Sequence, residues 1–440
     1  MLGGVIYVLI LMAREQILTT IDVGSSKIVT LIAEVSEENI QVIGVSSVPS
    51  QGIKKGVVVD IDDAVESLSV GIESAERMAG VTISRVWVTV NGSHISSVNS
   101  QGVVAITSPD GEIMPNDVDR VIEAARAVSM PSSREIIHVV PRSFVIDSQE
   151  GIHDPIGMSG TRLQVETHLI SGATTSMRNL VKCVQQVGLD VENLVYTGLA
   201  SSESVLTETE KELGVVLVDI GGGTTDVVVF IDGSPVYSSV LKIGGKNITS
   251  DIAIGLRVSI EDAERIKQYV STKISTLAAT AAGGNSEEET DSELFDVSSL
   301  AIENVSSIDK KFLIEGVIEP RLEEISEEIV QEIKKSGYEG MVPAGLVVCG
   351  GTAHTLGLKE ILVHEVNLPV RVAEPQGVTG LVDELNSPSF AASVGTVLYA
   401  AHGFSGGSSF MPGVPKVSLS FSGVKQSFKG VVSWFKGFIP

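Results

Sequence analysis

The chain has only two cysteines in 440 residues. Cys183 and Cys349 both lie in apolar segments, so neither a disulfide framework nor a cysteine metal site is indicated, and the pair is typical of a reduced cytosolic protein. Basic residues are also few: 31 Lys and Arg stand against 55 Asp and Glu, which gives a net charge of −24. Because the nucleic-acid backbone rewards Lys and Arg, this balance disfavours non-specific binding to nucleic acid.

Aromatic side chains make up only 4% of the chain, whereas hydrophobic residues make up 43%. This composition is typical of an α/β protein whose cores consist of Val, Ile, Leu and Ala. A chain of 440 residues is too long for one core, so we expect at least two large lobes.

The N-terminal apolar run, residues 1–12, is too short to span a bilayer. It also lacks the basic segment and the cleavage site of a signal peptide. We expect Met12 to be the more natural start, directly ahead of the first strand, and residues 1–16 to be an extension or a disordered segment. An N-terminal anchor is the alternative.

A glycine-rich turn between two apolar strands, residues 218–230, is the most informative segment of the chain. Successive glycines let backbone N–H groups approach an anion closely, and the threonine hydroxyls that follow add donors. A carboxylate would repel a phosphate, so Asp219 and Asp226 are expected to hold a hydrated cation beside it. The predicted phosphate-binding residues of this turn are Gly221, Gly222, Gly223, Thr224 and Thr225.

A second segment, residues 21–29, has the same order of strand, turn and strand. Here Asp22, like Asp219, is expected to reach a magnesium ion through water. Either turn alone is also typical of an ordinary hairpin. Two such turns far apart in sequence indicate duplicated halves that face each other across one nucleotide. The predicted binding residues of this turn are Asp22, Gly24, Ser25, Ser26 and Lys27.

Two further segments extend this pattern. After an apolar strand, Gly350, Gly351 and Thr352 form a turn whose backbone can lie flush against a flat ligand, ahead of a helix N-terminus. Glu264 and Lys267 are three residues apart and therefore share a helix face. There the glutamate can accept hydrogen bonds from ribose hydroxyls while the lysine stem covers the base. An exposed ion pair is the alternative interpretation.

The C-terminal segment, residues 416–440, contains lysines but no acid, and it follows a linker rich in Gly, Ser and Pro at 403–415. At helical spacing its apolar side chains fall on one broad face, with lysines along one edge. This pattern is typical of a helix that lies in the surface of an anionic membrane; docking onto the protein body is the alternative. The predicted membrane-contacting residues are Phe421, Val424, Lys425, Phe428, Lys429, Val431, Val432, Trp434, Phe435, Lys436, Phe438 and Ile439.

The order of strand and helix patterns divides the chain into two lobes with two smaller parts. The acidic segment 272–299 is expected to be a solvated, mobile loop. Helices are predicted at 62–78, 116–128, 174–187, 262–269, 319–335 and 388–401. The parts are the first lobe (17–83 and 168–212), an inserted module (84–167), the second-lobe core (213–242 and 320–402) and its small subdomain (243–319).

The order of the two phosphate-type turns, the Glu264–Lys267 helix and the Gly-Gly-Thr turn resembles the actin-like ATPase superfamily. Longer strings resemble the FtsA family of bacterial cell-division proteins, over nearly the whole chain from residue 17 to 401 and again in the tail. These strings are 150–160 (EGIHDPIGMSG), 199–214, 247–253 (NITSDIA) and 317–321 (VIEPR).

This resemblance implies an α/β, actin-like two-lobed fold, with duplicated ribonuclease-H-like halves and an inserted α+β subdomain in the first lobe. It also implies ATP and Mg²⁺ as cofactors, filament formation, and a peripheral place on the cytoplasmic face of the membrane at the division site. The inserted module would contact later division proteins and neighbouring subunits. The subdomain 243–319 would bind the C-terminal tail of FtsZ, with Lys311 and Arg321 as contacts; a surface-helix role is the alternative for both.

One departure from the superfamily bears on turnover. Many of its members place Glu or Gln ahead of the helix between the two turns, where it orients the attacking water. Here Tyr196, Thr197 and Gly198 stand at that place and supply no general base. We therefore expect ATP binding with at most slow hydrolysis. A small-molecule kinase of actin fold and a pilus-assembly ATPase are the alternatives, and the basic tail argues against both.

Overall fold

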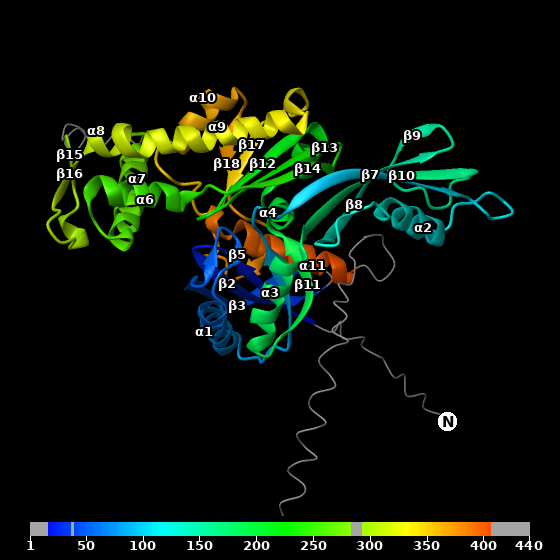
Figure 1. The fold of residues 1–440 in the computed structure, drawn as a ribbon, viewed down its shortest axis with the longest axis horizontal. Helices are drawn as coiled ribbons and strands as arrows, with labels where there is room; N and C mark the ends of the chain where they lie inside the picture. Colours follow the sequence, from blue (N-terminus) through cyan, green and yellow to red (C-terminus); the bar gives the residue numbers. More distant parts are fainter. Residues whose placement is uncertain (1–15, 37–38, 283–292, 406–440) are drawn as a thin grey trace, which may run out of the picture.

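The computed structural model describes residues 16–36, 39–282 and 293–405 (Figure 1). Within these ranges no helix has an apolar stretch long enough to cross a bilayer. The N-terminal extension up to residue 15 and the middle of the acidic segment lie outside the described residues. So do most of the linker and the whole tail, including every predicted membrane-contacting residue from Phe421 to Ile439.

A six-stranded sheet forms the centre of the first lobe, in the strand order β11-β6-β1-β2-β3-β19. Three strands form an antiparallel meander, and two parallel strands extend it on the β1 side. A short hairpin, β4 with β5, follows the meander. The strands are β1 (Gln16–Val23), β2 (Lys27–Val35), β3 (Ile40–Pro49), β4 (Ile53–Lys54), β5 (Val57–Val58), β6 (Arg85–Val90), β11 (Asp190–Tyr196) and β19 (Thr379–Gly380).

Helices cover both faces of this sheet, because the apolar residues of its central strands point both ways. On β2, Ile28 and Ile32 pack with helices α1 (Ile61–Ala79) and α3 (Thr174–Gln186). The residues between them, such as Leu31, pack with α11 (Ala391–Ser405) on the opposite face. The strands predicted at 17–48 and the helices predicted at 62–78 and 174–187 are thus confirmed.

The second lobe repeats the strand order of the first. Its five-stranded sheet runs β14-β13-β12-β17-β18, again an antiparallel meander extended by two parallel strands. The duplication predicted from the two turns is therefore present in the fold. The elements are β12 (Val215–Ile220), β13 (Thr225–Ile231), β14 (Ser234–Leu241), β17 (Leu346–Cys349), β18 (Val370–Val372), α4 (Thr197–Val205), α5 (Glu208–Leu213), α9 (Glu319–Ser336), α10 (Leu358–Val366), η3 (Glu339–Met341) and η4 (Pro388–Phe390).

The inserted module is an antiparallel sheet, β7-β10-β8-β9, with α2 packed on one face through its own core. Its boundaries differ from the predicted 84–167: β6 pairs with β1 inside the lobe sheet, and β10 continues to Ala173. The pairing of β6 with β1 and that of the end of β10 with β8 join residues far apart in sequence. Local sequence patterns do not reveal such pairings. The elements are β7 (Ser96–Ala105), α2 (Pro115–Arg126), β8 (Arg134–Ile146), β9 (Gln149–Ile152) and β10 (Arg162–Ala173).

The small subdomain lies on the opposite side of the molecule from the inserted module (Figure 1). The helix predicted at 262–269 is confirmed as part of α7, but the loop expected from residue 272 is wrong over 272–282, because α7 continues to Ala282. Its second half is rich in alanine, the strongest helix former. The elements are α6 (Gly245–Leu256), α7 (Ile260–Ala282), β15 (Leu294–Asp296), η1 (Ser298–Leu300), β16 (Ser307–Asp309), α8 (Lys310–Leu313) and η2 (Ile314–Ile318).

Helices α4 and α11 pack against each other at the junction between the lobes. A Cβ atom on Gly395 of α11 would lie 1.8 Å from the carbonyl oxygen of Ala200 in α4. The two backbones are therefore in direct contact, and only glycine permits this approach.

Replacing Gly395 by alanine should separate these two helices, because the opposing atom is backbone and cannot rotate away. We expect Gly395→Ala to lower the free energy of unfolding by about 1–3 kcal/mol, measured by urea denaturation. Gly340→Ala is the matched control, since no atom lies within 4 Å of a Cβ at that position. Equal stability of the two variants would show that the crossing has room for a methyl group.

Candidate nucleotide-binding site

The two glycine-rich turns meet between the lobes. A Cβ atom on Gly222 would lie 1.9 Å from the hydroxyl oxygen of Ser26, and one on Gly223 would lie 3.0 Å from that of Ser25. The first turn is closed by the N–H of Gly24, which donates to the carbonyl of Lys27 at 3.0 Å. The structure thus brings together two turns that are almost two hundred residues apart in sequence.

The second turn is also held by the segments that follow it. The N–H of Gly245, at the start of α6, donates to the carbonyl of Gly221 at 3.0 Å. The hydroxyl of Thr352 donates to the same carbonyl at 2.9 Å. Gly350 has a φ of +91°, and a Cβ there would lie 2.3 Å from the Oδ1 of Asp219, so this position requires glycine.

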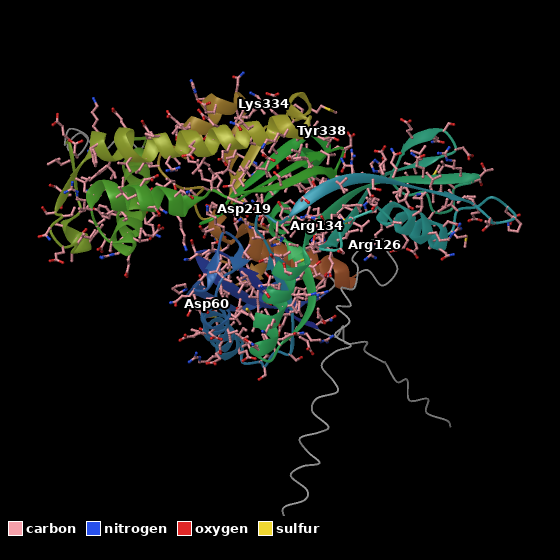
Figure 2. All side chains as sticks on the ribbon, viewed as in Figure 1. Asp60, Arg126, Arg134, Asp219, Lys334 and Tyr338 are labelled. Atoms are coloured by element: carbon pink, nitrogen blue, oxygen red, sulfur yellow. The ribbon has the colours of Figure 1, made fainter. Side chains whose placement is uncertain are left out.

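Two carboxylates lie at the ends of the central strands of the two sheets. Asp22 accepts hydrogen bonds from the hydroxyls of Thr89 and Ser393, each at 2.8 Å. Asp219 accepts one from Ser201 at 2.5 Å and lies where the two lobes meet (Figure 2). Burial raises the pKa of Asp219 to about 6, although the bond from Ser201 lowers it, and the charge of Asp22 adds to the rise.

Lys27 lies close to both carboxylates. Burial lowers the pKa of its ammonium to about 8, while the charges of Asp22 and Asp219 oppose this shift. The ammonium donates to Ser389 at 3.1 Å and lies 3.4 Å from the centroid of the Phe390 ring. It therefore provides one positive charge beside the two turns, on the side where α11 begins.

The acids at this site do not by themselves form a complete metal site. Among the residues of the three described ranges, no group of three or more His, Cys, Asp or Glu side chains is placed to ligate a metal. A magnesium ion here would take most of its ligands from phosphate and water, as Mg²⁺ usually does. The buried Asp219 and the partly buried Asp22, with Lys27 as a nearby cation, fit that role by acting through water.

Asp226 is held behind the second turn. Asn91, which follows β6, donates from Nδ2 to Asp226 at 2.7 Å and to the Thr224 hydroxyl at 3.2 Å. Burial raises the pKa of Asp226 well above its usual range, and the nearby charge of Asp219 raises it further. Asp226, which was expected to hold the cation together with Asp219, is only 1% exposed against 5% for Asp219, and one of its oxygens is already bound to Asn91.

Glu264 and Lys267 share a helix face as predicted, but they are not an exposed pair. Lys267 is only 9% exposed, and its ammonium donates to Glu264 at 2.7 Å, to Thr249 at 2.9 Å and to the carbonyl of Gly245 at 3.3 Å. Burial pushes the pKa of Glu264 up, but the charge of Lys267 and the hydrogen bonds from Lys267, Thr249 and Gln268 together hold it below its usual value. The pair ties α7 to the start of α6.

Some of the hydroxyl groups that were predicted to contact the nucleotide already form hydrogen bonds within the protein. The hydroxyl of Thr225 is fully buried and donates to the carbonyl of Ile243 at 2.9 Å, so it is not the anion donor that we expected. The hydroxyl of Thr352 is likewise bound to Gly221. That of Ser25 accepts from the N–H of Gly56 at 2.9 Å and keeps its own hydrogen for another acceptor.

Sequence reasoning missed the side chains that hold the carboxylates, namely Thr89, Asn91, Ser201 and Ser393, and it missed Lys246. Thr89 lies near the end of β6, a parallel strand next to β1, and Asn91 directly follows that strand. Because ligand sites in such sheets lie at the carboxyl ends of the strands, polar residues there were a usable signal. Ser201 lies in the middle of α4 and Ser393 in the first turn of α11, and no local pattern distinguishes them.

Residues 92–171 match the family model described as the SHS2 domain inserted in FtsA, and residues 216–395 match that of cell division protein FtsA. Cell division protein FtsA of Pseudomonas aeruginosa is 39% identical, over 94% of both chains. That of Escherichia coli is 35% identical, over 88% of this chain and 90% of its own length. This chain belongs to the FtsA family.

Solved structures show the same actin-like fold at low identity. The PilM–PilN type IV pilus biogenesis complex aligns with a TM-score of 0.60 at 17% identity, over 87% of this chain and 98% of that one. MreB5 of Spiroplasma citri bound to ADP aligns with a TM-score of 0.51 at 13% identity, over 89% and 99%. In this FtsA-family protein the SHS2 match begins after β6, in agreement with the corrected boundary of the inserted module.

The buried Asp219 should make the stability of this FtsA-family protein depend on pH. Its pKa is about 6 in the folded protein against 3.8 for the ordinary group, so stability is lost as pH rises from about 4 to about 6. Asp219→Asn keeps an oxygen for the Ser201 bond and removes the charge. We expect it to raise the free energy of unfolding at pH 7.5, by at most about 3 kcal/mol, as measured by urea denaturation without nucleotide.

The gain in free energy of unfolding from Asp219→Asn should be smaller at pH 5, where the wild-type carboxyl is largely protonated. Asp383→Asn, which changes an exposed acid, is the control and should show neither effect. A variant with the same gain at both pH values would contradict the assignment of the cost to ionisation.

Proposed function

We propose that this protein binds ATP with Mg²⁺, polymerises as an actin-like filament and links FtsZ to the cytoplasmic face of the membrane at the division site. The observation that carries the proposal is the meeting of the two glycine-rich turns, with Asp22 and Asp219 beside them. In this role the protein helps to assemble the Z ring, and its inserted module recruits later division proteins.

The nucleotide would lie between the lobes. Backbone N–H groups of the two turns would hold the phosphates, and Asp22 and Asp219 would hold the hydrated magnesium ion. Glu264 would accept from the ribose, with the Gly350–Gly351 backbone against the base. The related fold of MreB5, whose solved structures contain ADP or AMPPNP, supports this reading.

Slow hydrolysis is part of the proposal. Tyr196 is fully buried and donates from its hydroxyl to the carbonyl of Ser239 at 3.2 Å. The hydroxyl of Thr197 donates to the carbonyl of Val90 at 3.3 Å. Both are therefore committed to backbone, and neither is a base for the attacking water. Nucleotide state would then change by slow turnover or by exchange.

An exposed apolar surface on the small subdomain supports a partner site for the FtsZ tail. Ile254 is 77% exposed and Phe312 is 46% exposed, and a Cβ on the neighbouring Gly255 would lie 3.6 Å from the Phe312 ring. The side chain of Lys311 is 81% exposed beside them. Arg321 is ion-paired with Asp251 at 2.5 Å and with Glu324. Lys311 has one longer ion pair, 3.8 Å to Glu315, so it is the more available cation.

Phe312→Ala should weaken binding of a peptide with the sequence of the FtsZ tail. An aromatic side chain at the centre of an interface contributes about 1–2 kcal/mol, so we expect a roughly tenfold higher Kd by fluorescence anisotropy. Val363→Ala removes a similarly exposed apolar side chain on α10 and should leave the Kd unchanged. If both variants bind as well as the wild type, the partner site lies elsewhere.

Removing residues 416–440 should abolish flotation of the protein with vesicles that contain anionic lipid. Each basic residue near such a surface contributes about 1 kcal/mol, so replacing Lys425, Lys429 and Lys436 by glutamine should weaken flotation strongly and make it insensitive to salt. Unchanged thermal unfolding of the shortened chain is the control. Flotation of the shortened chain at the wild-type level would refute the tail as the anchor.

A further inference from the structure

Lys246 contacts both glycine-rich turns through different atoms. Its backbone N–H, in the first turn of α6, donates to the carbonyl of Gly222 at 2.7 Å. Its side chain crosses to the other lobe, where the ammonium donates to the carbonyl of Ser25 at 2.6 Å. One residue therefore closes the second turn and also joins it to the first.

The charges around this ammonium are mostly of its own sign. Partial burial lowers the pKa of Lys246; the charge of Glu264 opposes the shift, and those of Lys54 and Lys267 increase it. Glu264 is itself bound to Lys267, and Lys246 has no carboxylate at ion-pair distance in the part of the chain that the structure describes. Its hydrogen bond goes to a neutral carbonyl oxygen, which stabilises an ammonium less than an anion does.

The position of this ammonium would put it near the terminal phosphate of a bound polyphosphate. The proposed phosphate donors are the N–H groups of the same two turns, and Lys246 is bound to a carbonyl in each of them. The ribose and base would lie toward the Glu264–Lys267 pair and Gly350. The group nearest to both turns at once is therefore the terminal phosphate.

We propose that Lys246 is a latch between the lobes, which holds the carbonyl of Ser25 without nucleotide and transfers to the terminal phosphate of a bound nucleoside triphosphate. A diphosphate leaves the latch on the carbonyl. This inference rests on the proposed nucleotide binding and adds to it a residue that distinguishes triphosphate from diphosphate.

The latch has a consequence for the small subdomain. Lys246 begins α6, and Ile254 of the proposed partner surface lies near the end of the same helix. A helix of 12 residues moves as one body, so a shift of its first turn toward the phosphate also displaces that surface. Nucleotide state and partner binding would thereby be coupled.

The test is the affinity of the full chain for a non-hydrolysable ATP analogue and for ADP, each with Mg²⁺. Lys246→Ala should weaken the triphosphate analogue about tenfold and change ADP less than about twofold. Lys246→Arg should restore part of the difference, because it keeps the charge. Lys242→Ala, which removes an exposed lysine just ahead of α6, should change neither affinity.

Equal weakening of both nucleotides by Lys246→Ala would overturn the proposal, because it would show a general electrostatic effect. No weakening of either would overturn it too. If the unaltered chain bound neither nucleotide, the proposed function itself would fail, and this result is distinct from both.

Hydrogen exchange tests whether Lys246 holds the carbonyl of Ser25 in the absence of nucleotide. Without nucleotide, Lys246→Ala should speed exchange of the amides at residues 24–27, whereas Lys242→Ala should not. With the triphosphate analogue bound to the wild type, these amides should be protected by the phosphate. Unchanged exchange in Lys246→Ala without nucleotide would show that the bond to Ser25 holds nothing in place.

Discussion

The direct contact between the two glycine-rich turns is the constraint on which the rest of the structure depends. Gly222 approaches Ser26 so closely that a Cβ would overlap its hydroxyl at 1.9 Å, so a larger residue would at least force the Ser26 side chain to move. This contact aligns the ends of β1 and β12. It therefore brings Asp22 and Asp219 close to each other beside the two turns.

Bringing these acids together has a cost, which the fold limits with neutral donors. Asp219 and Asp226 are both buried, and their raised pKa values show that ionisation is unfavourable there. Hydroxyl and amide groups of neighbouring elements bind the carboxylates, at 2.5 Å from Ser201 and 2.7 Å from Asn91. Asp219, with a pKa of about 6, still carries its charge at neutral pH, so the site retains an affinity for cations.

Local sequence signals predicted the turns, and long-range pairing decided most of what was missed. Glycine next to an acid at the end of an apolar run is visible within ten residues, which is why the two turns and the meanders could be predicted. β6 belongs to the lobe sheet because it pairs with β1, which is distant in sequence. Val23 of β1 and Thr89 of β6, which share a hydrogen bond, are 66 residues apart. Lys246 was missed for the same reason, since its partner Ser25 is 221 residues distant.

Helix α11 connects the cleft to the end of the described chain. Its Ser393 donates to Asp22 at 2.8 Å, and two residues later Gly395 lies against the backbone of α4. Its apolar side chains cover one face of the first-lobe sheet, and the segment that contains the basic tail follows Ser405. Side chains of α11 pack on the first-lobe sheet, and Ser393 in its first turn binds Asp22, the acid proposed to reach the cation. Helix α11 therefore contacts this acid near its start and precedes the proposed membrane anchor in the chain.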